Sequence, residues 1–515
     1  MLTDTVFCVL SVKFVDSQAA FYSLIVSVRH PDIVGEELSD FINNNYQYML
    51  TRRNFIKSTA AAGALMMLPS CQTARVKCAN GKLNVAVIGV GGRGEAAVSA
   101  FEKRPDKVNM VAFCDIMPDT AIKPWGGYRS AAFSYKKFPN VPRFTDYRKM
   151  LDKMDKEIDA VVVAVPDHMH YPIASWAIAK GKHVYCEKPL TRTVWEAREL
   201  RRLASEAGVI TQMGNQGHTN EGWRVLREWY DAGIIGEIKD IYMWTNRPIW
   251  PQGGLKMPKG EKVPAGVDYK SWLGVAPYQP YSSEVLPFNW RGLRNYGTGA
   301  AGDMMCHFMD VPYSAFELGC PETIWGTSTP FDDYNWPAAS KTEMVFNNKR
   351  GVGGKIRLHW SDANVRPKEI ERVDDPSIFT VNPKNKWQNA NFTFIVGTKE
   401  TIRTNEYGMG TMIFPPKRMR DMAKAGALPA KTIERSVTPN NPHMEWVLAC
   451  IDGKQPKANF DYAAPFTEMC LLSMISLSFQ GEKLHYNQDK MEFTNCKEAN
   501  AHLRSLYDYN KEYLA

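Results

Sequence analysis

The strongest constraint on this chain is a glycine-rich turn between a strand-like run and a helix-like run. Residues 83–88 are apolar and rich in β-branched side chains, which is typical of a buried strand. Gly89-Val90-Gly91-Gly92-Arg93-Gly94 follows at once, and residues 95–103 have a helical pattern. Strand, G-x-G-x-x-G and helix in this order predict a dinucleotide-binding turn, with the helix N-terminus facing the pyrophosphate.

An acidic residue follows the next predicted strand. That strand covers residues 108–114, and Asp115 lies about 20 residues beyond Gly94, the usual spacing for the acid that binds the adenosine ribose. A carboxylate at this place accepts a hydrogen bond from the ribose and repels a 2′-phosphate. We therefore expect NAD rather than NADP as the cofactor.

Three further apolar runs each end in a cluster of polar residues. The runs cover residues 159–165, 183–186 and 209–213, and the clusters after them are Pro166-Asp167-His168-Met169-His170, Glu187-Lys188-Pro189 and Gly214-Asn215-Gln216-Gly217-His218. A helix is predicted over residues 171–180, ending at Gly181. Ligands of open parallel sheets bind at the carboxyl ends of the strands. The pattern predicts an α/β fold with these clusters beside the cofactor.

Four motifs occur together in a fixed order: G-x-G-x-R-G, P-D-x-x-H, G-K-H-V-x-C-E-K-P and G-D-x-x-x-H. In this combination the chain resembles the glucose-fructose oxidoreductase / inositol dehydrogenase (Gfo/Idh/MocA) family, and most closely its exported bacterial branch. The resemblance runs from about residue 83 to the C-terminus. It implies an N-terminal Rossmann domain over residues 81–213 and a C-terminal mixed α/β domain with a large open sheet over residues 214–515. It also implies a homo-oligomer.

The resemblance assigns roles to individual residues. The pyrophosphate turn would comprise Gly89, Gly91, Gly92, Arg93 and Gly94, and the ribose would be bound by Asp115. The nicotinamide side would be lined by Asp167, His170, Glu187 and Asn215. Lys188 matches the catalytic lysine of the family, and Asp303 and His307 match its D-x-x-x-H pair. Four residues apart on a helix, Asp303 and His307 share one face, so the carboxylate can orient the imidazole.

Oxidation of a secondary alcohol requires a base for the hydroxyl proton while hydride leaves carbon. His307 is the expected general base because its ordinary pKa lies near working pH. Lys188 as a cation would stabilise the developing alkoxide. The roles could be exchanged if burial lowered the pKa of Lys188. His168 and His170 lack a third ligand at a recognisable spacing, so no metal is expected.

Aromatic residues of the second half are candidates for sugar binding. Trp250, Trp272 and Trp290 could pack on the apolar face of a sugar ring, or they could be large core residues of a sheet. Arg291 precedes Asp303 and could donate to substrate hydroxyls. Pro-marked stretches at residues 249–267 and 365–388 are long for loops and could frame the pocket.

A twin-arginine leader is predicted ahead of the Rossmann pattern, over residues 49–80. Arg52 and Arg53 precede an Ala-rich apolar stretch that is shorter than the roughly 20 residues a membrane span needs. Leu68-Pro69-Ser70-Cys71 also resembles a lipoprotein processing site, so Cys71 is a candidate lipid anchor. We expect synthesis to start at Met49, with residues 1–48 an upstream extension outside the fold; a translated N-terminal extension is the alternative.

Composition excludes several classes of protein. The chain has 515 residues with 44% hydrophobic and 23% charged residues, which is ordinary globular composition without a predicted transmembrane span. Its net charge of +8 includes no run of five like charges, so nucleic acid is not an expected partner. The ten cysteines have no C-x-x-C spacing and are expected to be core residues rather than a disulfide framework.

These observations together predict an exported, periplasmic, NAD-dependent oxidoreductase acting on a secondary hydroxyl of a sugar or glycoside. The resemblance implies oxidation at C3, giving a 3-keto-glycoside, with a tightly bound cofactor. Two alternatives stay open: an NAD-dependent glycosidase that works by transient oxidation and elimination, and a non-catalytic sugar- or cofactor-binding protein. By the resemblance, glycosidases of this family commonly lack the lysine of Glu187-Lys188-Pro189, so its presence argues against the first alternative. Lys188, Asp303 and His307 together argue against the second.

Overall fold

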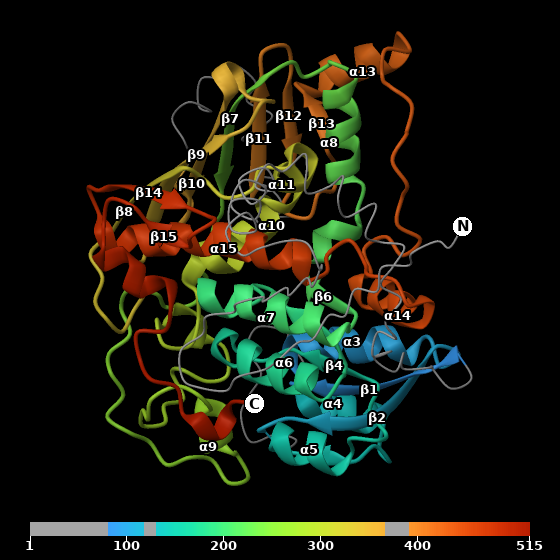
Figure 1. Cartoon of the computed structure of the whole chain (residues 1–515), viewed down its shortest axis with the longest axis vertical. Coiled ribbons are helices and arrows are strands. Elements are labelled where there is room, and N and C mark those ends of the chain that lie inside the picture. Colours follow the sequence, from blue (N-terminus) through green and yellow to red (C-terminus); the bar gives the residue numbers. More distant parts are fainter. Residues whose placement is uncertain (1–80, 118–129, 366–390) are drawn as a thin grey trace, which may run out of the picture. The chain divides into compact units, whose positions relative to one another are not determined.

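The computed structural model describes residues 81–117, 130–365 and 391–515 (Figure 1). All of them belong to one compact unit, Thr73–Ala515. The predicted leader, Cys71 and the extension over residues 1–48 lie outside the described residues. So does most of the stretch at residues 365–388.

The first half folds around a six-stranded sheet with the order β3-β2-β1-β4-β5-β6, in which all pairs are parallel. Its strands are β1 (Leu83–Ile88), β2 (Val108–Cys114), β3 (Arg143–Phe144), β4 (Ala160–Val163), β5 (His183–Glu187) and β6 (Thr211–Gly214). The five strands expected from the sequence are therefore confirmed, with bounds that differ by at most two residues. Strand order reverses between β1 and β4, which is the place where doubly wound sheets bind their ligands.

Helices cover both faces of this sheet, as the nearly continuous apolar strands require. They are α3 (Gly92–Glu102), α4 (Ala131–Lys137), α5 (Tyr147–Lys153), α6 (His170–Ala179) and α7 (Val194–Ala207). Val85 and Val87 pack with Phe101 of α3, whereas Ala86 and Ile88 pack in a second cluster with Ile173 of α6. Alternate residues of β1 thus enter two separate cores, one on each face.

The second half forms a nine-stranded mixed sheet with the order β13-β12-β11-β7-β10-β9-β8-β14-β15. Its strands are β7 (Ile238–Trp244), β8 (Thr323–Ser328), β9 (Ser340–Asn347), β10 (Lys355–Ser361), β11 (Phe392–Gly397), β12 (Thr401–Thr404), β13 (Met412–Phe414), β14 (Lys483–Asn487) and β15 (Glu492–Phe493). Only β7 and β10 pair in parallel; the other pairs are antiparallel. The α/β fold class with a Rossmann domain and a large C-terminal sheet is confirmed.

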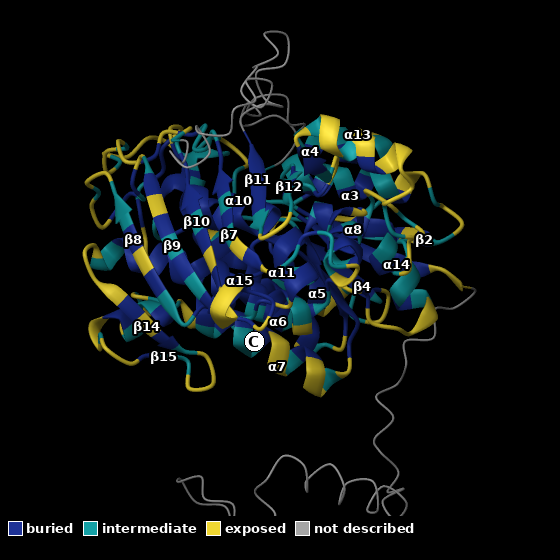
Figure 2. Cartoon of the chain, turned by 90° about the horizontal axis from the view of Figure 1, so that it is seen from above, coloured by how far each residue is buried: buried dark blue, intermediate teal, exposed yellow. Residues whose placement is uncertain are grey.

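Buried and partly exposed residues alternate along the strands of this second sheet, most regularly on β9 (Figure 2). One face is therefore packed and the other is open. The helices of this half are α8 (Gly222–Asp231), α9 (Tyr269–Leu273), α10 (Gly299–Phe308), α11 (Asp310–Phe316), α13 (Pro416–Lys424), α14 (Pro442–Asp452) and α15 (Phe460–Ser476). A single hydrophobic cluster extends from the first sheet through α6, α7, α10 and α15 to the second sheet.

The longest helix, α15, lies in this shared core. Over Phe460–Phe479 it is long and apolar enough to cross a membrane by length and composition, but 78% of its most apolar window is buried inside the protein. It packs against α7, α10 and β8. In this structure it is therefore a core helix of the fold.

The boundary between the two halves is not simple in sequence. Helix α14 lies far beyond residue 214, yet Met444, Trp446 and Val447 belong to the core that covers one face of the six-stranded sheet. At the other face, the Tyr147 hydroxyl donates to the Tyr513 carbonyl at 2.7 Å. The C-terminal segment therefore contributes to both halves.

Candidate active site

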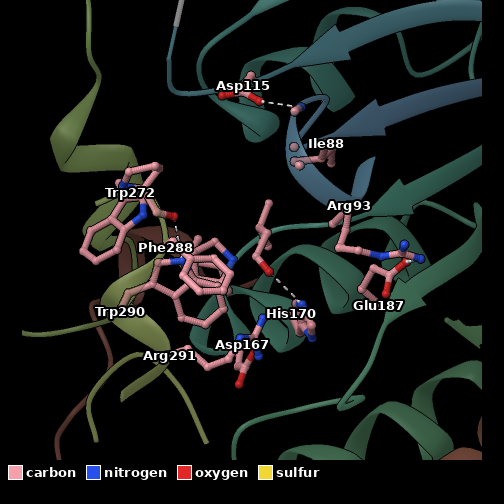
Figure 3. Close-up of a pocket in the computed structure, with 18 of the residues that line it drawn as sticks. Ile88, Arg93, Asp115, Asp167, His170, Glu187, Trp272, Phe288, Trp290 and Arg291 are labelled. Atoms are coloured by element: carbon pink, nitrogen blue, oxygen red, sulfur yellow. Dashed lines mark hydrogen bonds and ion pairs between the residues drawn. The ribbon is translucent and has the colours of Figure 1, made fainter. Parts of the chain in front are cut away.

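A cavity of about 380 Å³ opens at the carboxyl ends of β1, β2, β4 and β5 and extends to residues of the second half (Figure 3). Most of the residues expected from the sequence line it: Gly89, Gly91, Gly92, Arg93, Asp115, Asp167, His170, Glu187, Lys188, Trp250, Trp290, Arg291, Asp303 and His307. Gly94 and Asn215 do not. The strand-end clusters therefore converge on one cavity together with residues that follow them by a hundred positions or more.

The glycine turn at the end of β1 brings bare backbone to the cavity wall. Gly89 has φ +79°, and a Cβ there would lie 2.2 Å from the Ala164 carbonyl oxygen. A Cβ on Gly94 would lie 1.7 Å from the Gly89 carbonyl oxygen, so this glycine permits α3 to pack against the turn. The turn thus has the close backbone approach and helix start that a pyrophosphate needs. The residues present fit a dinucleotide.

Asp115 holds the same turn from β2. Its Oδ2 accepts hydrogen bonds from the backbone N–H of Val90 at 2.9 Å and Gly91 at 3.4 Å, and its Oδ1 accepts from Met117 N–H at 3.0 Å. Burial raises the pKa of this carboxyl, while the three backbone donors oppose that rise. Asp115 therefore lines the cavity and also orders the glycine turn.

Arg93 and Glu187 face each other across one end of the cavity (Figure 3). The Arg93 Nη2 lies 3.4 Å from Glu187 Oε1. Glu187 is buried, and a Cβ on Gly214 would lie 2.8 Å from its Cδ, so β6 leaves room for this side chain only because residue 214 is glycine.

The Lys188 ammonium forms a buried ion pair with Asp303 Oδ1 and also donates to the Asp303 backbone carbonyl at 2.9 Å. Arg291 Nη1 lies 3.1 Å from the same Asp303 oxygen and 3.4 Å from Asp167 Oδ1. Burial opposes ionisation of Asp303, but the charges of Arg291 and Lys188 outweigh it and hold the pKa of this carboxyl well below its usual value. Asp303 is therefore an anion between two cations.

His307 lies one helical turn beyond Asp303 on α10, as predicted, and is buried. Burial and the nearby Lys188 charge lower its pKa well below the ordinary value for histidine, so the ring is neutral at working pH. Its Nδ1 has no hydrogen-bond partner among the described residues. The neutral ring lines the cavity, although its pKa does not lie near working pH as the sequence argument for a general base assumed.

His170 lines the cavity, but both of its ring nitrogens already face backbone carbonyls. Nδ1 lies 2.8 Å from the Pro189 oxygen and Nε2 lies 2.9 Å from the Val165 oxygen. The ring therefore ties the end of β4 to the turn that carries Lys188, and it positions that lysine rather than presenting a nitrogen to a ligand.

Asn215 was expected on the nicotinamide side, but it is not among the residues that line the cavity. Its side-chain amide donates at 2.9 Å to both the Cys306 carbonyl and Asp310 Oδ1. His218 Nδ1 and the Tyr462 hydroxyl also lie within 2.9 Å of the same Asp310 oxygen. Asn215 belongs to this buried network because α11 places a carboxylate beneath the strand end, a partner that the local sequence does not reveal.

The opposite wall of the cavity is aromatic. Trp272, Phe288 and Trp290 lie together there, and Trp250 meets Phe288 edge-on with ring centroids 5.9 Å apart (Figure 3). The Arg291 guanidinium lies 4.4 Å from the centre of the Trp290 ring. Trp250, Trp272 and Trp290 are thus both largely buried and in contact with the cavity.

Arg247 and Tyr407 are among the lining residues that the sequence did not single out. Arg247 follows β7, and Tyr407 comes from the loop between β12 and β13 and meets His307 edge-on with ring centroids 5.2 Å apart. Asn220 Nδ2 donates to the Tyr407 carbonyl at 3.0 Å and fixes this loop against the segment between β6 and α8. No motif marks Tyr407, whereas Arg247 stands in an aromatic, Pro-containing segment that could have drawn attention.

Among the described residues no group of three or more His, Cys, Asp or Glu side chains could hold a metal ion. All seven cysteines in the described ranges are free, and five of them are buried: Cys114, Cys186, Cys306, Cys450 and Cys470.

Models of known families match both halves of the chain. Residues 83–215 match the model described as oxidoreductase family, NAD-binding Rossmann fold, and residues 239–318 match the model described as oxidoreductase family, C-terminal alpha/beta domain. Residues 49–69 match the TAT (twin-arginine translocation) pathway signal sequence, which supports export by that route.

Curated proteins match this chain over part of their length and at low sequence identity. An uncharacterized oxidoreductase of Schizosaccharomyces pombe is 35% identical over 36% of this chain and 40% of its own length. Levoglucosan dehydrogenase of Pseudarthrobacter phenanthrenivorans is 24% identical over 48% of this chain and 55% of its own length. The chain thus matches about half of the length of these curated relatives.

A solved structure of a levoglucosan dehydrogenase with NADH and levoglucosan has the same fold: it covers 79% of this chain and 100% of its own at a TM-score of 0.51 and 16% identity. The matched order of a Rossmann domain, a C-terminal α/β domain and a twin-arginine signal agrees with the motifs that converge on the cavity. Residues 83–215 and 239–318 thus match the NAD-binding and the C-terminal domain models of the GFO_IDH_MocA oxidoreductase family.

Proposed function

We propose that this protein is an exported NAD-dependent oxidoreductase that moves hydride between a secondary hydroxyl of a sugar or glycoside and a tightly bound nicotinamide. The observation that carries the proposal is the juxtaposition of Lys188, Asp303 and His307 in the same cavity as the glycine turn. A cation, its counter-ion and a neutral imidazole are the groups that an alcohol oxidation requires beside a hydride acceptor.

Each group has a separate task. The Lys188 ammonium donates a hydrogen bond to the substrate oxygen and stabilises negative charge as it develops there. Asp303 holds that ammonium in place through its side chain and its backbone carbonyl. The neutral His307 ring accepts the hydroxyl proton. Because Lys188 is paired with a carboxylate, we assign it the role of cation and give the role of base to His307.

NAD fits the glycine turn and supplies the hydride acceptor when bound. The turn brings bare glycine backbone and the start of α3 to the cavity wall, where a pyrophosphate would lie, and Asp115 places a carboxylate beside the turn at the end of β2. The negative charge of Asp115 favours a ribose hydroxyl over a 2′-phosphate, and this supports NAD over NADP. The NADH complex of the levoglucosan dehydrogenase points the same way.

The substrate side supports a sugar. The aromatic wall suits the apolar face of a pyranose ring, and Arg291 and Arg247 can donate to ring hydroxyls. The names of the relatives agree with this class of substrate. We infer C3 as the oxidised position from the resemblance to the exported branch of the family.

The test is incubation of the purified protein, with its co-purified cofactor, against a panel of glycosides, followed by NMR. We expect a new ring carbonyl in one glycoside, with the glycosidic bond intact and bound NAD reduced. Release of free reducing sugar without a ketone or NADH would instead establish a glycosidase. Tight sugar binding without any product would establish a binding protein, and either outcome overturns the proposal.

We also propose a periplasmic location, a lipid anchor at Cys71 and a homo-oligomer. The match to a twin-arginine signal supports the periplasmic location. The Leu68-Pro69-Ser70-Cys71 sequence supports the lipid anchor, and the open face of the nine-stranded sheet supports the homo-oligomer. Cell fractionation, mass spectrometry of the mature N-terminus and light scattering test them in turn. An unmodified mature N-terminus beyond Cys71 would overturn the lipid anchor.

A further inference from the structure

A second cavity lies apart from the first. It has a volume of about 410 Å³ and shares none of its described lining residues with the candidate active site. Its walls come from the N-terminus of α7, the loop before α10, helix α15 and the C-terminal segment around Tyr507. None of the motifs that identified the active site contributes to it.

Cationic side chains predominate in this second cavity. Arg192, Arg294 and Arg504 line it, and Asp333 is the only acidic residue among the lining residues. His502 also lines it, but burial and the Arg294 charge lower its pKa and favour the neutral ring. Asp333 is fully exposed and lies 3.4 Å from Arg294. In the described part of the chain, no carboxylate oxygen comes within ion-pair distance of Arg192 or Arg504. The lining therefore has more positive than negative charge.

Arg192 is fixed in place by two hydrogen bonds and a ring contact. Its Nη1 donates to the Arg294 carbonyl at 3.3 Å and its Nη2 donates to Ser505 Oγ at 3.0 Å, while its guanidinium lies 4.8 Å from the centre of the Tyr507 ring. Its buried Nε has no hydrogen-bond partner among the described residues. A buried donor without a partner is costly. The guanidinium that carries it lines the cavity, where an anion would meet its positive charge.

The rest of the lining is apolar and aromatic. Leu471, Met474 and Ile475 of α15 form one side, and Trp336 and Tyr507 contribute rings. Thr193 and Val194 at the start of α7 also line it, and the Glu196 side chain caps this end of the helix. Such a site suits a ligand with one negatively charged group on an apolar or aromatic body, rather than a bare inorganic ion.

We propose that this cavity is a binding site for an organic anion, whose carboxylate, sulfate or phosphate group contacts Arg192 while its apolar body packs on Trp336 and α15. One residue connects this site to the active site. Thr298 lines the second cavity, and its backbone N–H and Oγ1 donate to Asp167 Oδ2 in the first cavity at 3.1 and 2.8 Å.

The test is calorimetric titration of the full chain, saturated with NAD, using phenyl phosphate as the probe. Benzyl alcohol serves as the neutral analogue, and inorganic phosphate serves as the anion without an apolar body. We expect saturable binding of phenyl phosphate that is at least tenfold tighter than either control, because charge-assisted hydrogen bonds and apolar contact act together.

Substitutions show whether phenyl phosphate binds in this second cavity. Arg192→Met should weaken phenyl phosphate about tenfold, and Arg504→Met, at an exposed position that carries little of the fold, should weaken it severalfold. Arg202→Met removes an exposed arginine of α7, outside the cavity, and should leave the affinity unchanged. Because Arg192 lies outside the first cavity, its effect separates binding here from binding at the glycine turn. The proposal would be overturned if both Arg192→Met and Arg504→Met bound phenyl phosphate as tightly as the wild type. It would also be overturned if the wild type bound benzyl alcohol as tightly as phenyl phosphate.

Discussion

Acid should destabilise this protein through buried histidines, and His168 allows the effect to be isolated. His168 is fully buried between the rings of Trp272 and Tyr296, and its Nε2 lies 3.0 Å from the Trp272 carbonyl. Its Nδ1 has no partner among the described residues. Burial lowers the pKa of His168 to about 3. The native ring is therefore neutral at pH 5, whereas the same ring in the unfolded chain is protonated below about pH 6.5.

The sign and size of the effect follow from this difference. The unfolded state binds the additional proton, so stability falls as the pH falls below the unfolded pKa of His168. Each pH unit below about 6.5 costs about 1.4 kcal/mol, which gives about 2 kcal/mol between pH 7 and pH 5. Asp362 acts in the opposite sense, because burial raises its pKa to about 7 and the native state gains a proton there. The whole protein therefore does not report on His168 alone.

The decisive comparison uses His168→Gln, which cannot titrate but keeps an N–H donor for the Trp272 carbonyl. Urea unfolding followed by tryptophan fluorescence gives the free energy of unfolding at pH 7 and pH 5. Between these two values the wild type should lose about 2 kcal/mol more than His168→Gln. The exposed His485→Gln should follow the wild type, because its side chain meets solvent in both states. Equal losses in the wild type and His168→Gln would refute the reasoning.

Three further predictions concern the active site. Lys188→Met should lower turnover of the active glycoside about 10²–10³-fold while leaving NAD affinity unchanged. Lys180→Met, which removes an ion pair with Asp152 outside the cavity, should change neither turnover nor NAD affinity. Gly89→Ala should abolish NAD-induced thermal stabilisation because its Cβ would lie 2.2 Å from a carbonyl oxygen, whereas Gly181→Ala, with φ +71° and open space, should retain it. Asp115→Asn should narrow the preference for NAD over NADP about tenfold in fluorescence titrations, and an unchanged ratio would contradict the assigned role.

Much of the first half could be predicted from local sequence because its elements are strongly patterned. The composition of the run ending at Ile88 predicts a strand, and the glycine-rich turn that follows a strand and precedes a helix predicts dinucleotide binding. The rule that ligands meet at the carboxyl ends of parallel strands then brought Asp167, Glu187 and Lys188 to one cavity without any knowledge of side-chain positions.

The site residues that could not be predicted from the sequence depend on contacts between distant segments. Asn215 stands at a strand end like the others, but Asp310 lies beneath it and binds its amide, and only packing decides this. Tyr407 reaches the cavity because a hairpin loop of the second sheet is held against Asn220. Contacts between segments so distant in sequence leave no local pattern. The direction of the Asn215 side chain and the position of the loop that carries Tyr407 therefore could not be predicted from one sequence.

The charges around the first cavity balance within the described residues, and this bears on what can enter it. Lys188 and Arg291 face Asp303 and Asp167, and Arg93 faces Glu187, while the His307 ring is neutral. A charged substrate would meet no uncompensated partner at these pairs, whereas a neutral polyol can exchange hydrogen bonds with each of them. The second cavity has the opposite character, because Arg192 and Arg504 have no carboxylate within ion-pair distance in the described ranges. The same chain therefore presents a balanced cavity suited to a neutral sugar and an unbalanced one suited to an anion.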